Sequence, residues 1–206
     1  MSERRIELAA TILLSVAAVA TAWSSYQATR WNGEQALSAS RTNQIRVEAA
    51  RAQAEGESQT QVDVATFIQW VDADAHDDDE LADFYEERFR DEFQPAFDAW
   101  LATDPIGNPT APPTPFAMDE YQVAATEQAA DLDEQEQDSA AEVRRNVIRA
   151  SDYVLGVVLF AVALFFAGMS TKLDSLRLQT VMLVVGYTVF LGTVAWMATF
   201  PISFVT

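Results

Sequence analysis

Residues 8–29 read LAATILLSVAAVATAWSSYQAT, which is 22 consecutive positions without a charged side chain between Glu7 and Arg30. A helix rises 1.5 Å per residue, so this stretch would measure about 33 Å, and the hydrocarbon core of a bilayer is about 30 Å thick. It therefore predicts a first transmembrane helix over residues 8–29. A cleaved signal peptide is the competing interpretation, but the apolar run is too long for one and no A-x-A cleavage site is followed by a mature start.

Two more uncharged stretches lie toward the carboxyl end. Residues 153–171 read YVLGVVLFAVALFFAGMST, and residues 178–200 also lack charged side chains. Both are apolar on every side, whereas a buried helix of a soluble protein usually keeps a polar stripe. They predict a second and a third transmembrane helix, joined in a hairpin around Lys172, Asp174 and Arg177.

The charges are concentrated between these apolar ends. The 206-residue chain is 50% hydrophobic and carries a net charge of -18. Residues 27–152 hold 28 of the 31 acidic residues and nine of the 13 basic residues, a net charge of -19, which leaves +1 for the remainder. The absence of cysteine excludes a disulfide scaffold and a Cys-based zinc or redox site. The acidity argues against a nucleic-acid partner.

Helix breakers are scarce on both sides of the acidic middle. Proline first appears at Pro95, and residues 118–155 contain neither proline nor glycine. We therefore expect an all-α fold in which helical stalks over residues 30–57 and 118–152 continue the first two spans. The later stalk has a thin apolar seam at 3–4 spacing, so we expect it to pair as a coiled coil with the first stalk, in the same chain or in a neighbour. A disordered acidic linker is the alternative.

Residues 58–117 contain the only stretch that resembles a soluble core. They predict a small helical cap with two apolar faces, the second bent at Pro95, followed by a stiff proline-rich loop over residues 104–115. Recognition of its PxxP-like segments by another domain is a less favoured interpretation. The first face comprises Val64, Phe67, Ile68 and Val71, and the second comprises Leu81, Phe84, Tyr85, Phe89, Phe93, Phe97, Trp100 and Leu101.

Aromatic residues occur near the expected ends of the spans, where membrane proteins place amphipathic rings. The predicted interfacial residues are Trp23, Tyr26, Trp31, Tyr153 and Trp196. The basic residues near the amino terminus and in the hairpin favour a multi-pass protein of the cell membrane with a cytoplasmic amino terminus and an extracytoplasmic acidic domain. A larger group of arginines on the other side of the spans opposes this orientation.

A ladder of small residues follows the first span at every fourth position, and it consists of Ala17, Thr21, Ser25, Thr29 and Gly33. Small side chains let helices approach closely in lipid, where no hydrophobic drive brings them together. The ladder predicts a helix-packing face, used either among the three spans of one chain or in a homo-oligomer. If the Ser and Thr faces met around an axis, they would line a pore.

The acidic stretch VDADAHDDDE, residues 71–80, surrounds His76, the only histidine. Hard cations bind several oxygen ligands, so Asp72, Asp74, Asp77 and Asp79 are candidate ligands for calcium or magnesium. The spacing does not fit an EF-hand, because Asp77 occupies the position that requires glycine. The favoured interpretation is a solvated connector between two helices, with Asp78 or Asp79 as the N-cap of the second.

No recognised catalytic motif is present, and the spans contain no ionisable side chain for a proton relay. We therefore expect no catalytic residue, no cofactor and no enzyme activity. Lys172 is the only lysine, and Asp supplies 16 of the acids. This acid-rich, lysine-poor composition suggests halophilic adaptation, because the Debye length is only about 3 Å in 1 M salt and repulsion among the acids is then screened. An acidic vestibule that concentrates cations is the functional alternative.

Several segments resemble a family of small prokaryotic three-span membrane proteins with a helical extramembrane domain and no established activity. They are RRIELAATILL, AWSSYQATRWNGEQA, DVATFIQWVDA, LADFYEERFRDEFQPAFDAWLATDP, PFAMDEY and LFFAGMSTKL. The resemblance implies the same helical plan and brings no site residues. The first hypothesis is a non-enzymatic membrane protein that contacts lipid, self-associates and acts as a scaffold or partner-binding element. A homo-oligomeric cation channel is the second, and a metal-dependent hydrolase is the third.

Overall fold

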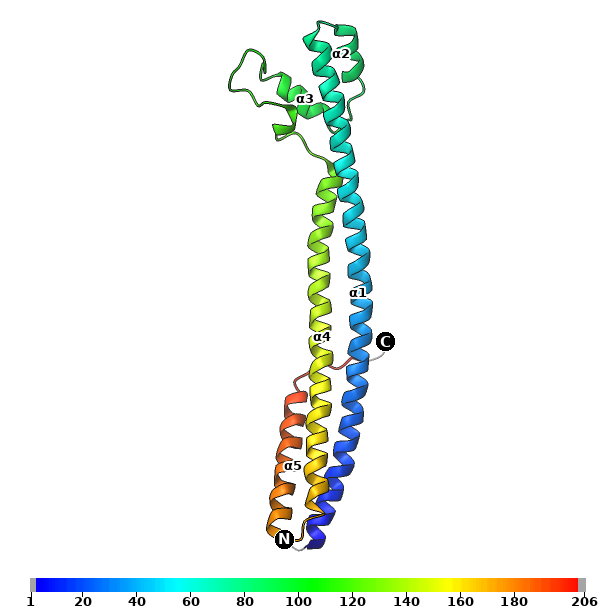
Figure 1. Cartoon of the computed structure of the whole chain (residues 1–206), viewed down its shortest axis with the longest axis vertical. Coiled ribbons are helices and arrows are strands. Elements are labelled where there is room, and N and C mark those ends of the chain that lie inside the picture. Colours follow the sequence, from blue (N-terminus) through cyan, green and yellow to red (C-terminus); the bar gives the residue numbers. More distant parts are fainter. Residues whose placement is uncertain (1–2, 204–206) are drawn as a thin grey trace. The chain divides into compact units, whose positions relative to one another are not determined.

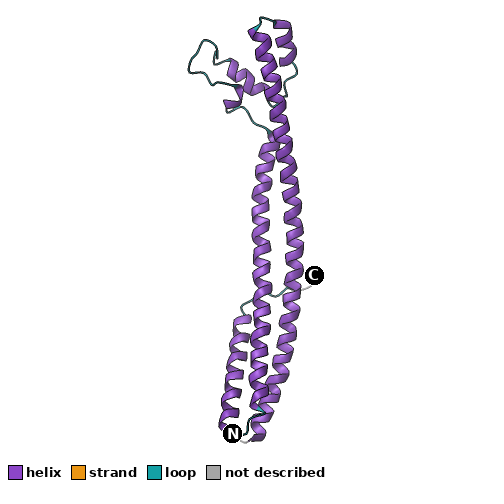
Figure 2. Cartoon of the chain, viewed as in Figure 1, coloured by secondary structure: helices purple, strands orange, loops and turns teal. Residues whose placement is uncertain are grey.

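The computed structural model describes residues 3–203, and these residues form helices, turns and loops without a strand (Figure 2). This confirms the all-α prediction. In chain order the elements are α1 (Glu3–Ala75), α2 (Asp79–Glu86), α3 (Gln94–Leu101), the short 3-10 helix η1 (Pro115–Ala117), α4 (Ala124–Ser170) and α5 (Leu176–Met197) (Figure 1).

Helices α1, α4 and α5 are each long and apolar enough to cross a membrane. The prediction of three such helices is confirmed. α1 continues without interruption past residue 58, where the cap was expected to begin, and ends at Ala75. α4 begins at Ala124 rather than at residue 118, because η1 and a turn precede it.

The chain divides into two compact units. The first comprises Met1–Arg41 and Ser139–Thr206, and we call it the three-helix unit. The second comprises Thr42–Asp138, and we call it the acidic unit. α1 and α4 contribute residues to both.

The three-helix unit has an apolar core to which all three helices contribute, with alanines from α1 and α4 and larger apolar residues from each helix. Its buried members are Ile6, Ala10, Leu13, Ala17, Phe160, Ala163, Ala167, Leu183 and Phe190. A Cβ at Gly186 would lie 3.2 Å from a methyl carbon of Leu13 and 3.3 Å from the Ala163 carbonyl oxygen. The glycine therefore lets α5 pack closely against α1 and α4, which lie side by side with it (Figure 1).

The last described residues close one end of this unit. The Tyr153 hydroxyl donates to the Pro201 carbonyl oxygen at 3.1 Å, and the Ser203 amide donates to Gln27 Oε1 at 3.2 Å. A second buried cluster forms there from Ala28, Trp31, Ala150 and Tyr153, with Met197 and Phe200 packed against it. The segment after α5 is thus bound to both long helices.

In the acidic unit, α1 packs against the first part of α4 through small side chains. Ala49 and Ala52 of α1 and Ala125 and Ala129 of α4 are buried. A Cβ at Gly56 would lie only 2.4 Å from the Thr126 hydroxyl oxygen and 3.1 Å from its backbone nitrogen. A larger side chain at this close approach would have to move the Thr126 hydroxyl and shift the neighbouring backbone slightly, so glycine suits the position.

An aromatic cluster fills the rest of the acidic unit. Its buried residues are Phe67, Trp70, Ala73, Ala82, Phe89, Phe93, Phe97 and Trp100. Many of the rings meet edge to face, as the Trp70 and Phe97 rings do at 4.8 Å between centroids. Such pairs add about 0.5–1.5 kcal/mol each beyond the burial of area.

The prediction that residues 64–71 present one apolar face to the core was wrong. Only Phe67 of that set is buried, whereas Val64, Ile68 and Val71 are exposed. α2 and α3 instead cover the face that bears Phe67, Trp70 and Ala73, because aromatic rings bury more area than valine or isoleucine.

The expected bend at Pro95 is also absent among the described residues. α2 and α3 are separate helices, and Pro95 lies in the first turn of α3, where its missing amide proton costs nothing. Residues 102–114 form the expected loop, which the Trp100 indole holds by donating to the Pro112 carbonyl oxygen at 2.9 Å.

Candidate functional site

A buried carboxylate connects three segments of the acidic unit. Asp63 of α1 has a side chain that is 1% exposed. Its Oδ2 accepts hydrogen bonds from Arg90 Nη1 at 2.8 Å and from the Tyr121 hydroxyl at 3.1 Å. Arg90 follows α2 and Tyr121 precedes α4, so this one carboxylate bonds the loops on either side of α3 to the long helix.

The Arg90 guanidinium extends the network. Its Nη2 donates to Gln59 Oε1 at 3.0 Å and also contacts the Glu92 carboxylate. Burial raises the pKa of the Asp63 carboxyl, while the Arg90 charge and the hydrogen bonds lower it less. Burial likewise raises the pKa of the Tyr121 hydroxyl. These groups form hydrogen bonds to one another. Their arrangement is therefore more typical of a network that stabilises the fold than of a catalytic acid or base.

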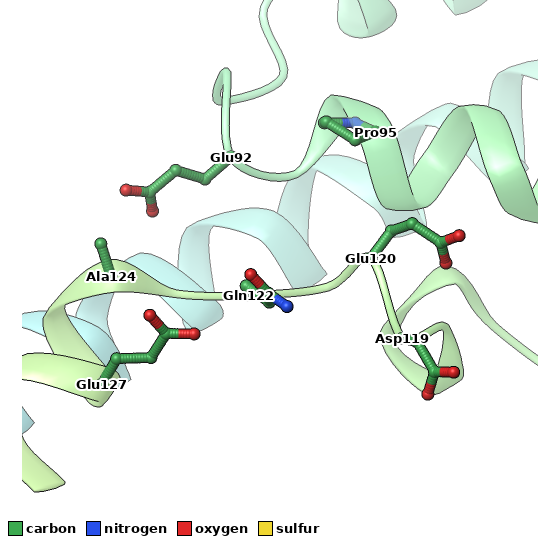
Figure 3. Close-up of a pocket in the computed structure, with 7 residues that line it drawn as sticks. All are labelled: Glu92, Pro95, Asp119, Glu120, Gln122, Ala124 and Glu127. Atoms are coloured by element: carbon green, nitrogen blue, oxygen red, sulfur yellow. The ribbon is translucent and has the colours of Figure 1, made fainter.

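An open acidic hollow lies beside this network. It has a volume of about 560 Å³ and is lined by Glu92, Pro95, Asp119, Glu120, Gln122, Ala124 and Glu127. Figure 3 shows the Glu92 and Glu127 carboxylates at one end and those of Asp119 and Glu120 at the other, beyond Gln122. Such a surface attracts cationic groups without enclosing them.

A second open hollow, of about 430 Å³, lies near α2. It is lined by Asp83, Glu86, Glu87, Phe89, Asp91 and Gln94. Burial, followed by repulsion from Asp98 and Asp83, raises the pKa of Glu86. Both hollows are lined mainly by acidic residues, so they add to the negative surface of the acidic unit.

The predicted metal ligands lie on a short connector. Asp72 and Asp74 are on the last turn of α1, Asp77 has a left-handed backbone with φ 57°, and Asp79 begins α2. All four are exposed, and no group of three potential ligands that could hold a metal ion occurs within residues 3–203. The structure does not bring these carboxylates together as a cage.

The favoured interpretation of this stretch, a connector between two helices, fits the structure. Asp78 is the N-cap of α2, and its Oδ1 accepts from the Leu81 amide at 3.2 Å. The expectation of Asp78 or Asp79 as the cap is therefore confirmed. His76 Nδ1 lies 2.7 Å from the Asp72 carbonyl oxygen, one turn back on the same helix.

The residues of the predicted helix-packing ladder do not stay on one face of α1. Ala17 is fully buried and Thr21 is half-buried, whereas Ser25, Thr29 and Gly33 are exposed. A step of four residues advances about 400° around a helix with 3.6 residues per turn, so the ladder drifts by about 40° per step. The face packed in the three-helix unit instead repeats every seven residues, at Ala10, Ala17, Ser24, Trp31 and Ser38.

The predicted interfacial aromatics also divide into two groups. Trp23, Tyr26 and Trp196 are exposed, as residues that meet lipid headgroups would be. Trp31 and Tyr153 are buried within the unit. The Arg149 guanidinium lies over the Trp31 ring, 4.6 Å from its centroid.

Sequence reasoning missed the Asp63 network. A signal was present, because Asp63 precedes Phe67 by four residues and Trp70 by seven and so lies on their face of the helix. A single acid on an aromatic face indicates a buried charge with a partner. Arg90 and Tyr121 could not be identified as its partners, since they are 27 and 58 residues away.

No family model matches this chain, and no curated protein and no solved structure is significantly similar to it. The class is therefore defined by the fold alone. The chain is an all-helical protein with three helices suited to crossing a membrane and one acidic helical unit.

Proposed function

We propose that this protein is a non-enzymatic, multi-pass protein of the cell membrane that self-associates and serves as a scaffold or partner-binding element. The acidic unit lies outside the membrane, on the extracytoplasmic side in the preferred orientation. Its exposed carboxylates are available to cationic partners, and its interior is occupied by the aromatic cluster and the Asp63 network.

One observation carries the self-association. Ser25, Thr29 and Gly33 remain exposed on α1 after the three helices have packed. A Cβ placed at Gly33 meets no atom within 4 Å among the described residues. Small residues on an exposed helix face permit the close approach of another helix, within the expected span at Ser25 and Thr29 and just beyond it at Gly33, and the internal packing of this chain does not use them.

A cation channel is the second candidate. The exposed Ser25 and Thr29 hydroxyls and the acidic hollows favour it, because hydroxyls can line a pore and carboxylates concentrate cations at its mouth. The function requires a ring of subunits, since the core of a single three-helix unit is filled by side chains such as Leu13 and Phe160.

The molecular mass in detergent separates these candidates. One chain has a mass of 22.8 kDa, and we expect light scattering, corrected for bound detergent, to give at least twice that value. A monomer at all protein concentrations would contradict both candidates. A dimer excludes the channel, whereas three or more subunits together with sodium flux into proteoliposomes would favour it over the scaffold.

A further inference from the structure

Three hydrogen-bond donors are buried without a partner at the end of the three-helix unit that the last described residues close. They are Gln27 Nε2, Arg30 Nε and Trp31 Nε1, and no acceptor within residues 3–203 satisfies them. Gln27 is fully buried and Trp31 is 8% exposed. A buried donor without a partner is costly, so three of them in one place indicate an acceptor that binds there.

The three donors lie on one side of α1, because Arg30 and Trp31 follow Gln27 by three and four residues. Gln27 Oε1 accepts from the Ser203 amide, and Trp31 packs with Tyr153 of α4 in the second buried cluster. α4 and the segment after α5 therefore border the three residues, which we call the donor cluster. The Arg30 side chain is 32% exposed and connects the donor cluster to the surface.

Positive charge accompanies the donor cluster. The Arg149 guanidinium lies over the Trp31 ring, and no carboxylate of the described residues forms an ion pair with it. The Glu34 carboxylate lies 3.9 Å from Arg30 Nη2, which is beyond hydrogen-bond distance. Two guanidinium groups without a hydrogen-bonded acid favour an anionic acceptor.

The sequence around the donor cluster differs in charge from the acidic unit. Residues 27–41 and 139–152 together hold five basic and three acidic residues, a net charge of +2. Residues 42–138 hold 25 acidic and four basic residues, a net charge of -21. The parts of α1 and α4 at this end of the three-helix unit are therefore the ones suited to an anion.

The donor cluster lies at the level expected for lipid headgroups. Gln27 and Trp31 are about 29 and 35 Å along the helix from Leu8, where the first expected span begins, and the hydrocarbon core is about 30 Å thick. Arg149 precedes Tyr153, where the second expected span begins, by about one helical turn. The anionic group that a membrane supplies at this level is the phosphate of its phospholipids.

We propose that the donor cluster and Arg149 bind the phosphate of a membrane phospholipid. The buried side chains and Arg30 donate to the phosphate oxygens, and the two guanidinium groups offset the phosphate charge. The inference rests on the proposed membrane location and adds a lipid partner for the three-helix unit.

The test titrates lipid into the full-length protein in dodecyl maltoside, a detergent without phosphate, and counts bound lipid by native mass spectrometry. The probes are dioleoylphosphatidylglycerol and dioleoylglycerol, which has the same chains and no phosphate. We expect about one phosphatidylglycerol per chain, bound at least about 10-fold more tightly than the diacylglycerol, because hydrogen bonds to a charged group are the strong ones. Equal affinities would overturn the proposal and leave the donors to ordered water.

Inorganic phosphate distinguishes the two sources of the same chemistry. Excess sodium phosphate is added to the complex with phosphatidylglycerol, and sodium chloride of equal ionic strength is the control. We expect both salts to leave the same amount of lipid bound. Displacement by phosphate alone would assign the site to the free anion and overturn the lipid.

Two substitutions locate the site. Trp31→Phe removes the indole donor, Arg149→Gln removes one charge, and we expect each to weaken phosphatidylglycerol binding at least about 10-fold without changing diacylglycerol binding. Arg144→Gln is the matched control, because Arg144 is exposed and lies about 140° around α4 from Arg149. Equal weakening by Arg144→Gln and Arg149→Gln would indicate attraction to any surface charge and overturn the site. If Trp31→Phe does not fold, Arg149→Gln decides by the same ratio of affinities.

A separate measurement distinguishes failure of the lipid site from failure of the proposed function. Alkaline carbonate extraction of membranes reports whether the full chain is an integral membrane protein. A chain released by carbonate would reject both. A chain that stays in the membrane fraction but shows no preference for the phosphate lipid would reject the lipid site alone.

Discussion

Asp63 shows how one buried group can organise a unit rich in acids. Its carboxylate accepts from Arg90 and Tyr121, and Oδ1 has no hydrogen-bond partner within the described part of the chain. The raised pKa indicates that desolvation of the charge outweighs its attraction to Arg90. A neutral carboxyl or amide oxygen at this position could accept the same two hydrogen bonds, so we expect the contact between the three segments to tolerate loss of the negative charge.

This argument predicts different effects for two substitutions. Asp63→Ala leaves the Arg90 and Tyr121 donors unsatisfied and should lower the free energy of unfolding by about 3 kcal/mol. Asp63→Asn keeps an acceptor oxygen and should cost less than about 1 kcal/mol. Chemical unfolding in detergent, followed by tryptophan fluorescence, measures both, with the exposed Asp72→Asn as the neutral control. Equal losses for Ala and Asn would show that the charge dominates.

The raised pKa of Asp63 also predicts how the free energy of unfolding changes with pH. A carboxyl group whose folded pKa is raised above its ordinary value of 3.8 binds protons more readily in the folded state. The unfolding free energy of the unmodified protein, relative to that of Asp63→Asn, should therefore fall as pH rises from about 3.8 through the raised value, and then level off. A relative stability that increases over this window would contradict the desolvation argument.

For the long helices, the sequence predicted their lengths better than it predicted which faces are buried. Their apolar lengths and the lack of breakers predicted three candidate spans and the extended α1 and α4. The direction of each face was harder to predict, because it depends on which residues a neighbouring helix covers. The ladder from Ala17 to Gly33 and the set from Val64 to Val71 both have helical spacing, yet each contains buried and exposed members.

Gly56 tests the pairing of α1 with α4. Gly→Ala inside a helix normally stabilises it by about 1 kcal/mol, but here the new Cβ would lie 3.1 Å from the Thr126 backbone nitrogen and closer still to its hydroxyl. We expect Gly56→Ala to lower stability by about 1–3 kcal/mol. Gly33→Ala in the same helix meets no described atom and should be neutral or stabilising in the monomer. Equal melting temperatures for the two variants would argue against the close approach.

For the molecule as a whole, the acidic composition and the packed core of the acidic unit have opposite effects on stability. The charge of -21 over residues 42–138 opposes the compact acidic unit, and the aromatic cluster and the Asp63 network offset that repulsion.

Salt should therefore stabilise the acidic unit. Raising sodium chloride from 0.1 to 1 M shortens the Debye length from about 10 to about 3 Å and screens the self-repulsion. A gain of about 1 kcal/mol would raise the melting temperature by about 4–8 °C for a unit of this size. Near-ultraviolet circular dichroism measures the transition, and choline chloride is the matched control. A gain with sodium alone would indicate a specific cation site, and no gain with either salt would contradict the repulsion argument.

The sequence by itself determined the helical class, the three apolar candidate helices, the proline-rich loop and the Asp78 cap, because each depends on the hydropathy, length or backbone preference of a local stretch. Only the tertiary structure decided that Phe67 and Trp70 are buried while Ile68 is exposed, that Asp63 meets Arg90 and Tyr121, and that Gly56 meets Thr126. These outcomes depend on contacts between residues far apart in the chain. Helical periodicity can define a face, but the residues that pack against that face determine whether it is buried.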